Sequence, residues 1–203
     1  MTTTNNIFHI SFGLDCTIAY QLQIHSLRSC SFPFDWMKIK DINTIIDILD
    51  NKFIDFLSID NWSKDNKEDI KDINIFNYID DLIINENISN IKLKHKIHNI
   101  LLPHESNNDI CDLKEILNKY NRRINRFNNL MTNKDYKKII YIGLNKMINN
   151  NDKYKLYTTL NNYGCINYNV HFIIYSDYII PTNERYSWHR NWIPWNNIFN
   201  IHH

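Results

Sequence analysis

Cys16 is the residue of this chain whose type and position best suit nucleophilic chemistry. It follows the apolar run 7–12 and the turn residue Gly13, and apolar residues at 14, 18 and 22 surround and follow it. This order predicts a strand, a tight turn and a helix, with Cys16 in the first helical turn. A thiol there faces unpaired backbone N–H groups and the positive end of the helix dipole, which favour the reactive thiolate. The adjacent Asp15 can cap the helix, and it would raise the pKa of the thiol if it pointed inward.

A nucleophilic cysteine needs a base, because a cysteine beside an apolar strand is otherwise a small core residue. The chain has 9 histidines. His104 follows Pro103 at the end of an apolar run and precedes a helix cap, so it stands at an element end, where sites form. His189, in the C-terminal segment, is a second candidate to line a cleft. Spacing alone leaves both open.

Two other site types have less support in the sequence. His95 and His98 could share a helical face, but no acidic partner stands in a recognisable motif, so we expect neither a metal nor a cofactor. The arginines of the segment 109–131 read first as a solvated basic face. As an alternative function, they could join the tryptophan-rich C-terminus in a non-catalytic module that binds a ligand or a protein. The residues concerned are Arg122, Arg123, Arg126, Trp188, Trp192 and Trp195.

The composition is that of a folded globular protein. The 203 residues are 43% hydrophobic, and the formal net charge is +1. We therefore expect a single domain over 7–203 after a flexible tail over 1–6, with no electrostatic drive toward nucleic acid. No apolar run is long enough to cross a membrane, and Met1 to Asn6 does not read as a signal peptide. We expect a cytoplasmic protein of the producing or host cell.

The cysteine and asparagine usage adds two expectations. The 4 cysteines are widely spread with no Cys-x-x-Cys pair, which favours thiols over disulfides or a zinc ribbon. The chain is rich in Asn and Ile and has only 3 Gly. This bias indicates an AT-rich genome, such as that of a large DNA virus, a parasite or a low-GC bacterium.

The periodicity of apolar residues predicts an α/β fold with a small, mostly parallel sheet flanked by helices. We expect strands over 7–12, 92–102, 138–143 and 170–175. We expect helices over 14–22, 41–57, 109–131 and 153–163, and a surface loop over 145–152. A strand that leads directly into the cysteine helix favours this arrangement over an α+β fold, which is the alternative.

The opening of the chain resembles a poorly characterised family described as papain-like cysteine peptidases, found in bacteria and large DNA viruses. Ser11-Phe12-Gly13-Leu14-Asp15-Cys16 resembles its Ser-x-Gly-x-x-Cys turn, and Pro33-Phe34-Asp35-Trp36 resembles its Pro-Phe-Asp-Trp motif. Further on, His104, the arginine-rich segment 120–127 and the strand 139–142 match its later elements. The chain departs from the family pattern at Glu105-Ser106, in place of Asp-Phe, and at Gly143, where we expect an arginine.

The resemblance implies a cysteine-dependent hydrolase or related acyl-transfer enzyme that acts on a protein or peptide. It implies Cys16 as nucleophile and His104 as base. A third polar group should orient the histidine. The motif favours Asp35, whereas papain-like order along the chain favours Asp177, and Asp35 also suits a purely structural role.

Overall fold

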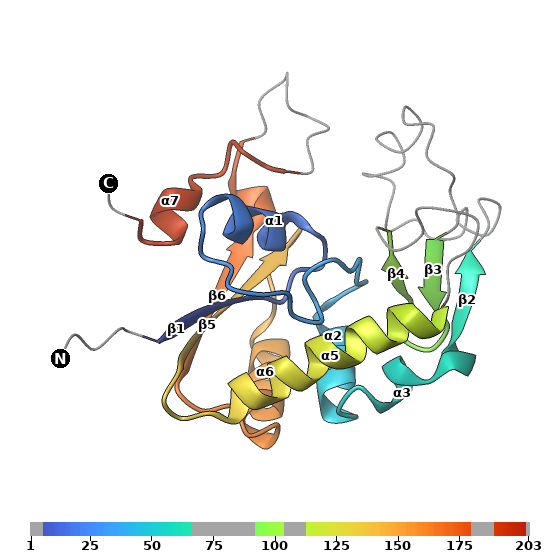
Figure 1. The fold of residues 1–203 in the computed structure, drawn as a ribbon. Helices are drawn as coiled ribbons and strands as arrows, with labels where there is room; N and C mark the ends of the chain where they lie inside the picture. The colour runs from blue at the N-terminus through green and yellow to red at the C-terminus, as the bar shows by residue number, and fades with distance from the viewer. Residues whose placement is uncertain (1–5, 66–91, 104–112, 180–188, 202–203) are drawn as a thin grey trace.

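A parallel sheet of three strands organises the N- and C-terminal parts of the chain. The computed structural model describes residues 6–65, 92–103, 113–179 and 189–201 (Figure 1). The strands are β1 (Ile7–Ser11), β5 (Lys137–Leu144) and β6 (Tyr168–Ile174), in the order β1-β5-β6. Ser11 pairs with Tyr141 and Leu144 with Ile174, so the carboxyl ends of all three strands meet at one edge. The expected mixed α/β fold with a parallel sheet is confirmed.

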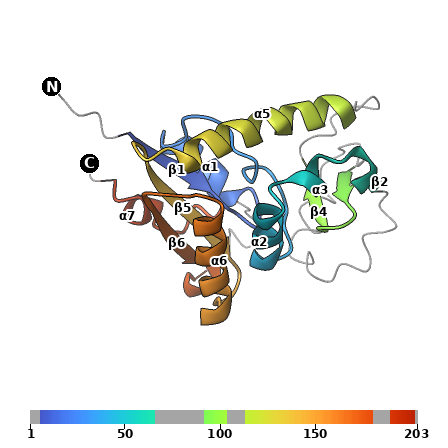
Figure 2. The same ribbon diagram turned by 90° about the horizontal axis from the view of Figure 1, so that it is seen from below.

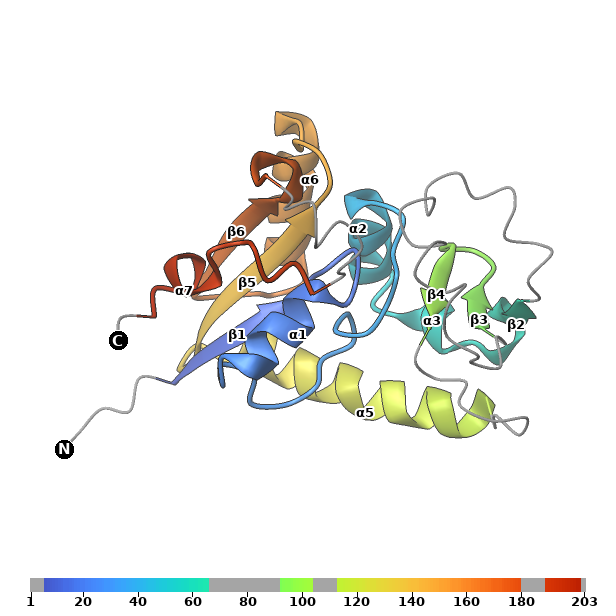
Figure 3. The same cartoon turned by 90° about the horizontal axis from the view of Figure 1, so that it is seen from above.

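Both faces of this sheet are covered, and the alternation of side chains along β5 separates the two cores. Ile140 and Ile142 belong to a large cluster with residues of α2 (Ile42–Asp50), α5 (Leu113–Thr132) and α6 (Asn150–Asn162). Tyr141 points the other way, into a smaller cluster with α1 (Thr17–Ile24) and the C-terminal segment that holds α7 (Trp195–Ile198). Figure 3 shows α1 and α7 on one side of the sheet and α6 on the other. Two apolar faces explain why these strands read as continuous apolar runs.

Two of the expected boundaries were wrong. The segment 41–57 is not one helix, because α2 ends at Asp50 and α3 (Ile54–Leu57) follows. Lys52 and Phe53 lie between the two helices and have φ of 53° and 64°. These positive angles turn the chain and place the Phe53 ring in the core. The expected loop over 145–152 is shorter, because α6 begins at Asn150. There the side chain of Asn149 accepts a hydrogen bond from Asp152 N at 2.8 Å, which caps the helix.

A second, antiparallel sheet lies apart from the first (Figure 2). It contains β2 (Trp62–Asp65), β3 (Lys92–His95) and β4 (Ile100–Leu102), after a 3-10 turn at Ile59–Asn61. The single strand expected over 92–102 is therefore a hairpin. His98 N donates to His95 Nδ1 at 3.1 Å and Asn99 takes a φ of 49°, which reverses the chain. The helix after Cys16 packs on the parallel sheet, not on this one.

The helix expected over 109–131 forms as α5 in its described part, and residues 109–112 lie outside the described residues. The apolar residues at helical spacing on α5 are buried from Ile116 to Leu130, and Phe127 is the central aromatic residue among them, 0% exposed. Five rings lie within 6.4 Å of the Phe127 ring, centroid to centroid: Phe12, Phe32, Phe34, Phe53 and Tyr163. This cluster joins α5 to the turn after β1 and to the Pro-Phe-Asp-Trp loop. In the described ranges no helix combines the length and the apolar character needed to cross a membrane.

Candidate active site

The turn from Ser11 to Thr17 is fixed by its own side chains. Ser11 Oγ accepts a hydrogen bond from Gly13 N at 3.2 Å, and Asp15 Oδ1 accepts one from Thr17 N at 2.9 Å. A Cβ on Gly13 would lie 2.4 Å from the carbonyl oxygen of Asp15, so the turn requires glycine there. The residues of the Ser-x-Gly-x-x-Cys pattern thus shape the backbone that presents Cys16.

Cys16 occupies the N-cap position of α1, one residue before the first helical turn in which we expected it. Its side chain is buried at 5% exposure, and its carbonyl oxygen accepts from Tyr20 N at 3.0 Å. Burial, with the charge of Asp15, raises the pKa of the thiol to about 12, although Lys38 acts in the opposite direction. The expectation that the helix start favours the thiolate is wrong for this state, because burial dominates and Asp15, not the sulfur, receives the Thr17 N–H. At neutral pH the sulfur is a thiol.

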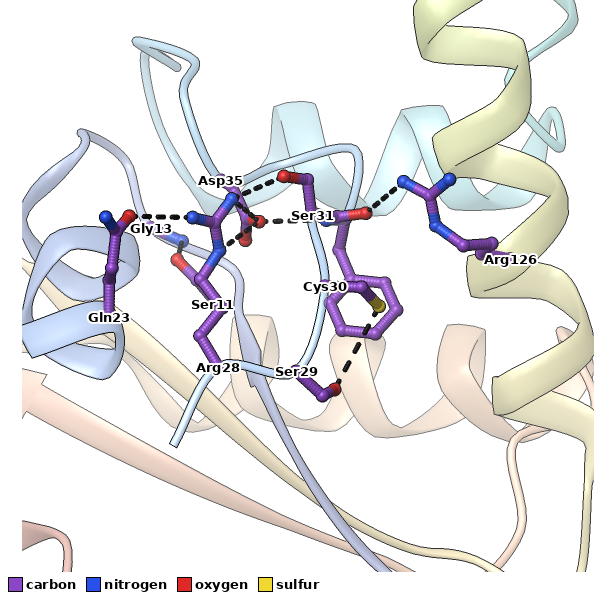
Figure 4. A network of polar contacts seen from close by, with 10 residues as sticks. Ser11, Gly13, Gln23, Arg28, Ser29, Cys30, Ser31, Asp35 and Arg126 are labelled. Carbon is purple, nitrogen blue, oxygen red and sulfur yellow. Dashed lines mark hydrogen bonds and ion pairs between the residues drawn. The ribbon is translucent and has the colours of Figure 1, made fainter. Parts of the chain in front are cut away.

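Asp35 is held by an ion pair with Arg28 (Figure 4). Asp35 Oδ2 accepts from Arg28 Nη2 at 2.9 Å and from Phe32 N at 2.8 Å. Arg28 also donates to Ser31 and Gln23. The carboxyl group is 1% exposed, and burial raises its pKa while Arg28 lowers it. These contacts give Asp35 a structural role in closing the 28–36 loop, and its charge still reaches Cys16.

Backbone hydrogen bonds bring the end of β4 to the cysteine turn. Ile39 N donates to Leu14 O at 2.9 Å, and Lys38 pairs with Leu101 through two bonds of 2.9 and 3.0 Å. The loop 28–39 therefore connects Leu14, two residues before Cys16, with Leu101, three residues before His104. His104 itself lies outside the described residues.

The carboxyl end of β6 supplies a residue that sequence reasoning missed. Asp177, the second candidate for a third polar group, is exposed at the end of the 3-10 turn Tyr175–Asp177. Tyr175, from the same turn, is buried, and its hydroxyl donates to Asp15 Oδ1 at 3.5 Å. Burial, with the charge of Asp15, raises the pKa of Tyr175 well above its ordinary value. Tyr175 also explains Gly143, because a Cβ on Gly143 would lie 1.9 Å from the phenol oxygen.

Gly143→Ala is expected to lower the free energy of unfolding by about 1–3 kcal/mol through this overlap. Tyr175→Leu provides the matched test, because it removes the phenol group that a Cβ at position 143 would meet. In a urea titration, Gly143→Ala should cost much less in the Tyr175→Leu background than in the native chain. Equal costs in both backgrounds would show that the phenol does not exclude a side chain here.

The arginines and tryptophans of the alternative binding surface differ in exposure where the structure describes them. Arg122 is exposed, but Arg123 is buried with its guanidinium 4.8 Å from the centre of the Tyr120 ring. Arg126 Nη2 donates to Ser31 O at 2.8 Å, which ties α5 to the 28–36 loop (Figure 4). Trp195 is buried in the smaller cluster, whereas Trp188 lies outside the described residues.

The two histidines considered as metal ligands lie in the β3–β4 hairpin of the antiparallel sheet. His95 and His98 do not share a helical face, because His95 ends β3 and His98 lies in the β3–β4 turn, where their rings stack. In the ranges that the structure describes, no three histidine, cysteine or acidic side chains gather as metal ligands would.

The fold and the turn together define an α/β protein with a cysteine at the junction of its first strand and first helix. The chain belongs to the family described as "Putative papain-like cysteine peptidase (DUF1796)", whose sequence model matches residues 8–177. The resemblance read from the sequence motifs is confirmed.

A shorter match links this chain to a viral protein. A stretch of 53 residues is 45% identical to an uncharacterized protein, R408, of Acanthamoeba polyphaga mimivirus, and covers 26% of this chain. That stretch spans 24% of the relative, about a quarter of its length. No solved structure matches this chain.

Proposed function

We propose that this protein is a cysteine-dependent hydrolase, or a related acyl-transfer enzyme, with Cys16 as nucleophile and His104 as base. The observation that carries the proposal is the backbone connection from the Cys16 turn through Ile39 and Lys38 to Leu101. Through this connection the 28–39 loop is bonded both to Leu14, in the strand–helix turn, and to Leu101. Leu101 is three residues before His104 in the sequence. Family membership supports the same pair, because Cys16 and His104 both fall within the matched residues 8–177.

The raised pKa of Cys16 decides how the first step proceeds. A thiol with a pKa of about 12 is not ionised before substrate binds. The base must therefore take the proton as the bond between sulfur and the acyl carbon forms, while the carbonyl π electrons move to oxygen. One backbone N–H near Cys16 would bind that oxyanion, and it has to be one other than the N–H of Thr17, whose hydrogen bond Asp15 already accepts. The amine leaves with the proton from the base, and water or another acceptor then cleaves the thioester.

We infer a protein or peptide substrate with an amide or isopeptide bond from the description of the family alone. The third polar group remains a choice between Asp35, already paired with Arg28, and the exposed Asp177. An orienting group needs a carboxylate that is not consumed by another ion pair. On this criterion Asp177 is the better candidate.

Labelling with an acyl-directed thiol probe, such as a peptide acyloxymethyl ketone, tests the proposal. We expect one equivalent of probe on the folded protein, lost in Cys16→Ala and retained in Cys30→Ala. Cys30 is the matched control because it is half-buried in the adjacent loop. His104→Ala should lower the labelling rate by about 10²–10⁴, the usual contribution of a general base. Labelling that survives in Cys16→Ala would reject the assignment.

A further inference from the structure

Arg190 is fully engaged with the cysteine turn although it is more than 170 residues away along the chain. Its Nη1 lies 2.7 Å from Asp15 Oδ2 in an ion pair and also donates to the hydroxyl of Thr17. Its guanidinium lies over the Tyr175 ring, 3.8 Å from the ring centre. Asp15 and Thr17 flank Cys16 on either side, so a single guanidinium binds the residue before the thiol and the residue after it.

The segment that carries Arg190 is anchored independently of this guanidinium. Gln21 Nε2, from α1, donates to His189 O at 2.6 Å, and the His189 ring lies 4.5 Å from that of Tyr20. Trp195 Nε1 donates to Arg190 O at 2.8 Å. Arg190 has a φ of 50°, a conformation that an arginine adopts only where its surroundings hold it. Replacing the guanidinium should therefore change the charge beside the turn while the segment stays in place.

The guanidinium changes the electrostatic effect of Asp15 on the thiol. Asp15 is adjacent to Cys16, and an unopposed carboxylate there disfavours the thiolate. Burial would raise the pKa of Asp15, but Arg190 and the bonds from Thr17 outweigh it and hold that pKa below its ordinary value. The Asp15 carboxylate is thus charged at neutral pH and paired with Arg190. Among the residues that the structure describes, the other charged groups that act on the thiol are Lys38 and Asp35, both from the 28–39 loop.

We propose that Arg190 is a positioning residue for Cys16: it neutralises the Asp15 carboxylate beside the thiol and clamps the turn between Asp15 and Thr17. This rests on the proposed function, in which the thiol proton has to be removed. Arg190 lies beyond residues 8–177, the stretch that the family's sequence model matches.

The test is the rate of Cys16 alkylation by iodoacetamide between pH 7 and 10, read by mass spectrometry with Cys30 as the internal reference. Four variants are compared with the native protein: Arg190→Gln, Arg190→Lys, Asp15→Asn and the Asp15→Asn/Arg190→Gln double variant. Arg190→Gln should slow Cys16 about tenfold, the effect of one pKa unit. Arg190→Lys should recover most of the rate, and the double variant all of it.

If Arg190 has only a structural role, Cys16 of the double variant should be alkylated no faster than Cys16 of Arg190→Gln. That result would overturn the proposal, and so would an unchanged alkylation rate in Arg190→Gln. If Arg190→Gln does not fold, the Asp15→Asn variant provides the test. A guanidinium left without its carboxylate should raise the rate of Cys16 alkylation above the native rate. A lower rate of Cys16 alkylation would overturn the proposal. Iodoacetamide reports on the thiol alone. If the acyl-directed probe does not label Cys16 but the alkylation rates of the variants keep the predicted order, the proposed hydrolase activity is rejected and the role of Arg190 beside the thiol stands.

Discussion

Alanine in place of Asp35 is expected to lower the free energy of unfolding by about 3–5 kcal/mol, the usual cost of removing one partner from a buried ion pair. The side chains of Asp35 and Arg28 are 2% and 12% exposed, so the remaining guanidinium would stay largely buried without its carboxylate. Phe32 N would also lose its acceptor. Urea titration of Asp35→Ala, Arg28→Ala and the double variant measures the coupling. The double variant should cost far less than the sum of the two single changes.

Asp177→Ala is the matched control for that experiment. Its side chain is exposed, so the stability should change by no more than about 0.5 kcal/mol. The pair also separates structure from chemistry. If Asp177 orients the base, Asp177→Ala slows acyl-probe labelling at native stability. Native stability in Asp35→Ala would contradict the structural role of the Arg28–Asp35 pair.

Phe127→Ala is expected to cost about 3–5 kcal/mol, because the ring is fully buried and its removal leaves a cavity. The loss should extend beyond α5, since the same ring contacts Phe12 after β1 and Phe34 in the Pro-Phe-Asp-Trp loop. Thermal or urea unfolding measures it, with the exposed Arg122→Ala on the same helix as control. A cost below about 1 kcal/mol would mean that the aromatic cluster repacks, and that it does not hold the motif loop to the sheet.

The parallel sheet could be predicted from the sequence because each of its strands is a short apolar run followed by turn residues. The sequence did not reveal the hairpin of β3 and β4, because the reversal depends on His98 N meeting His95 Nδ1, and neither glycine nor proline marks the turn. It likewise predicted one unbroken helix over 41–57, since no glycine or proline marks the positive φ of Lys52 and Phe53. Such local reversals are set by tertiary packing more than by residue type.

The candidate site was predicted only where its residues are neighbours in the chain. Cys16 and Asp15 were identified from spacing, and Asp15 does accept the Thr17 N–H. Tyr175 and Arg190 were missed because they meet Asp15 across at least 160 residues. One signal was present in the sequence: Gly143 in the middle of an apolar strand indicates close approach by another group, and that group is Tyr175.

The structure also changes the chemical meaning of the cysteine turn. A helix start alone suggested a preformed thiolate, whereas burial and Asp15 keep the sulfur protonated. The motif residues therefore build a rigid turn around a buried thiol, and the mechanism that we propose needs a base to remove its proton. The two reagents therefore measure different properties of Cys16. A small alkylating agent reports the ionisation of the thiol, whereas an acyl-directed probe reports whether nucleophile and base act together.

The most direct test of Cys16 as a nucleophile is a comparison of probe adducts on the folded and the urea-unfolded protein, mapped to each cysteine by mass spectrometry. Our account predicts that at pH 7 the acyl-directed probe modifies Cys16 of the folded protein faster than Cys30, although Cys16 is the more buried thiol. Unfolding should abolish that preference. Modification of Cys16 only after unfolding, at the same rate as the other cysteines, would contradict the account and leave Cys16 as a core residue.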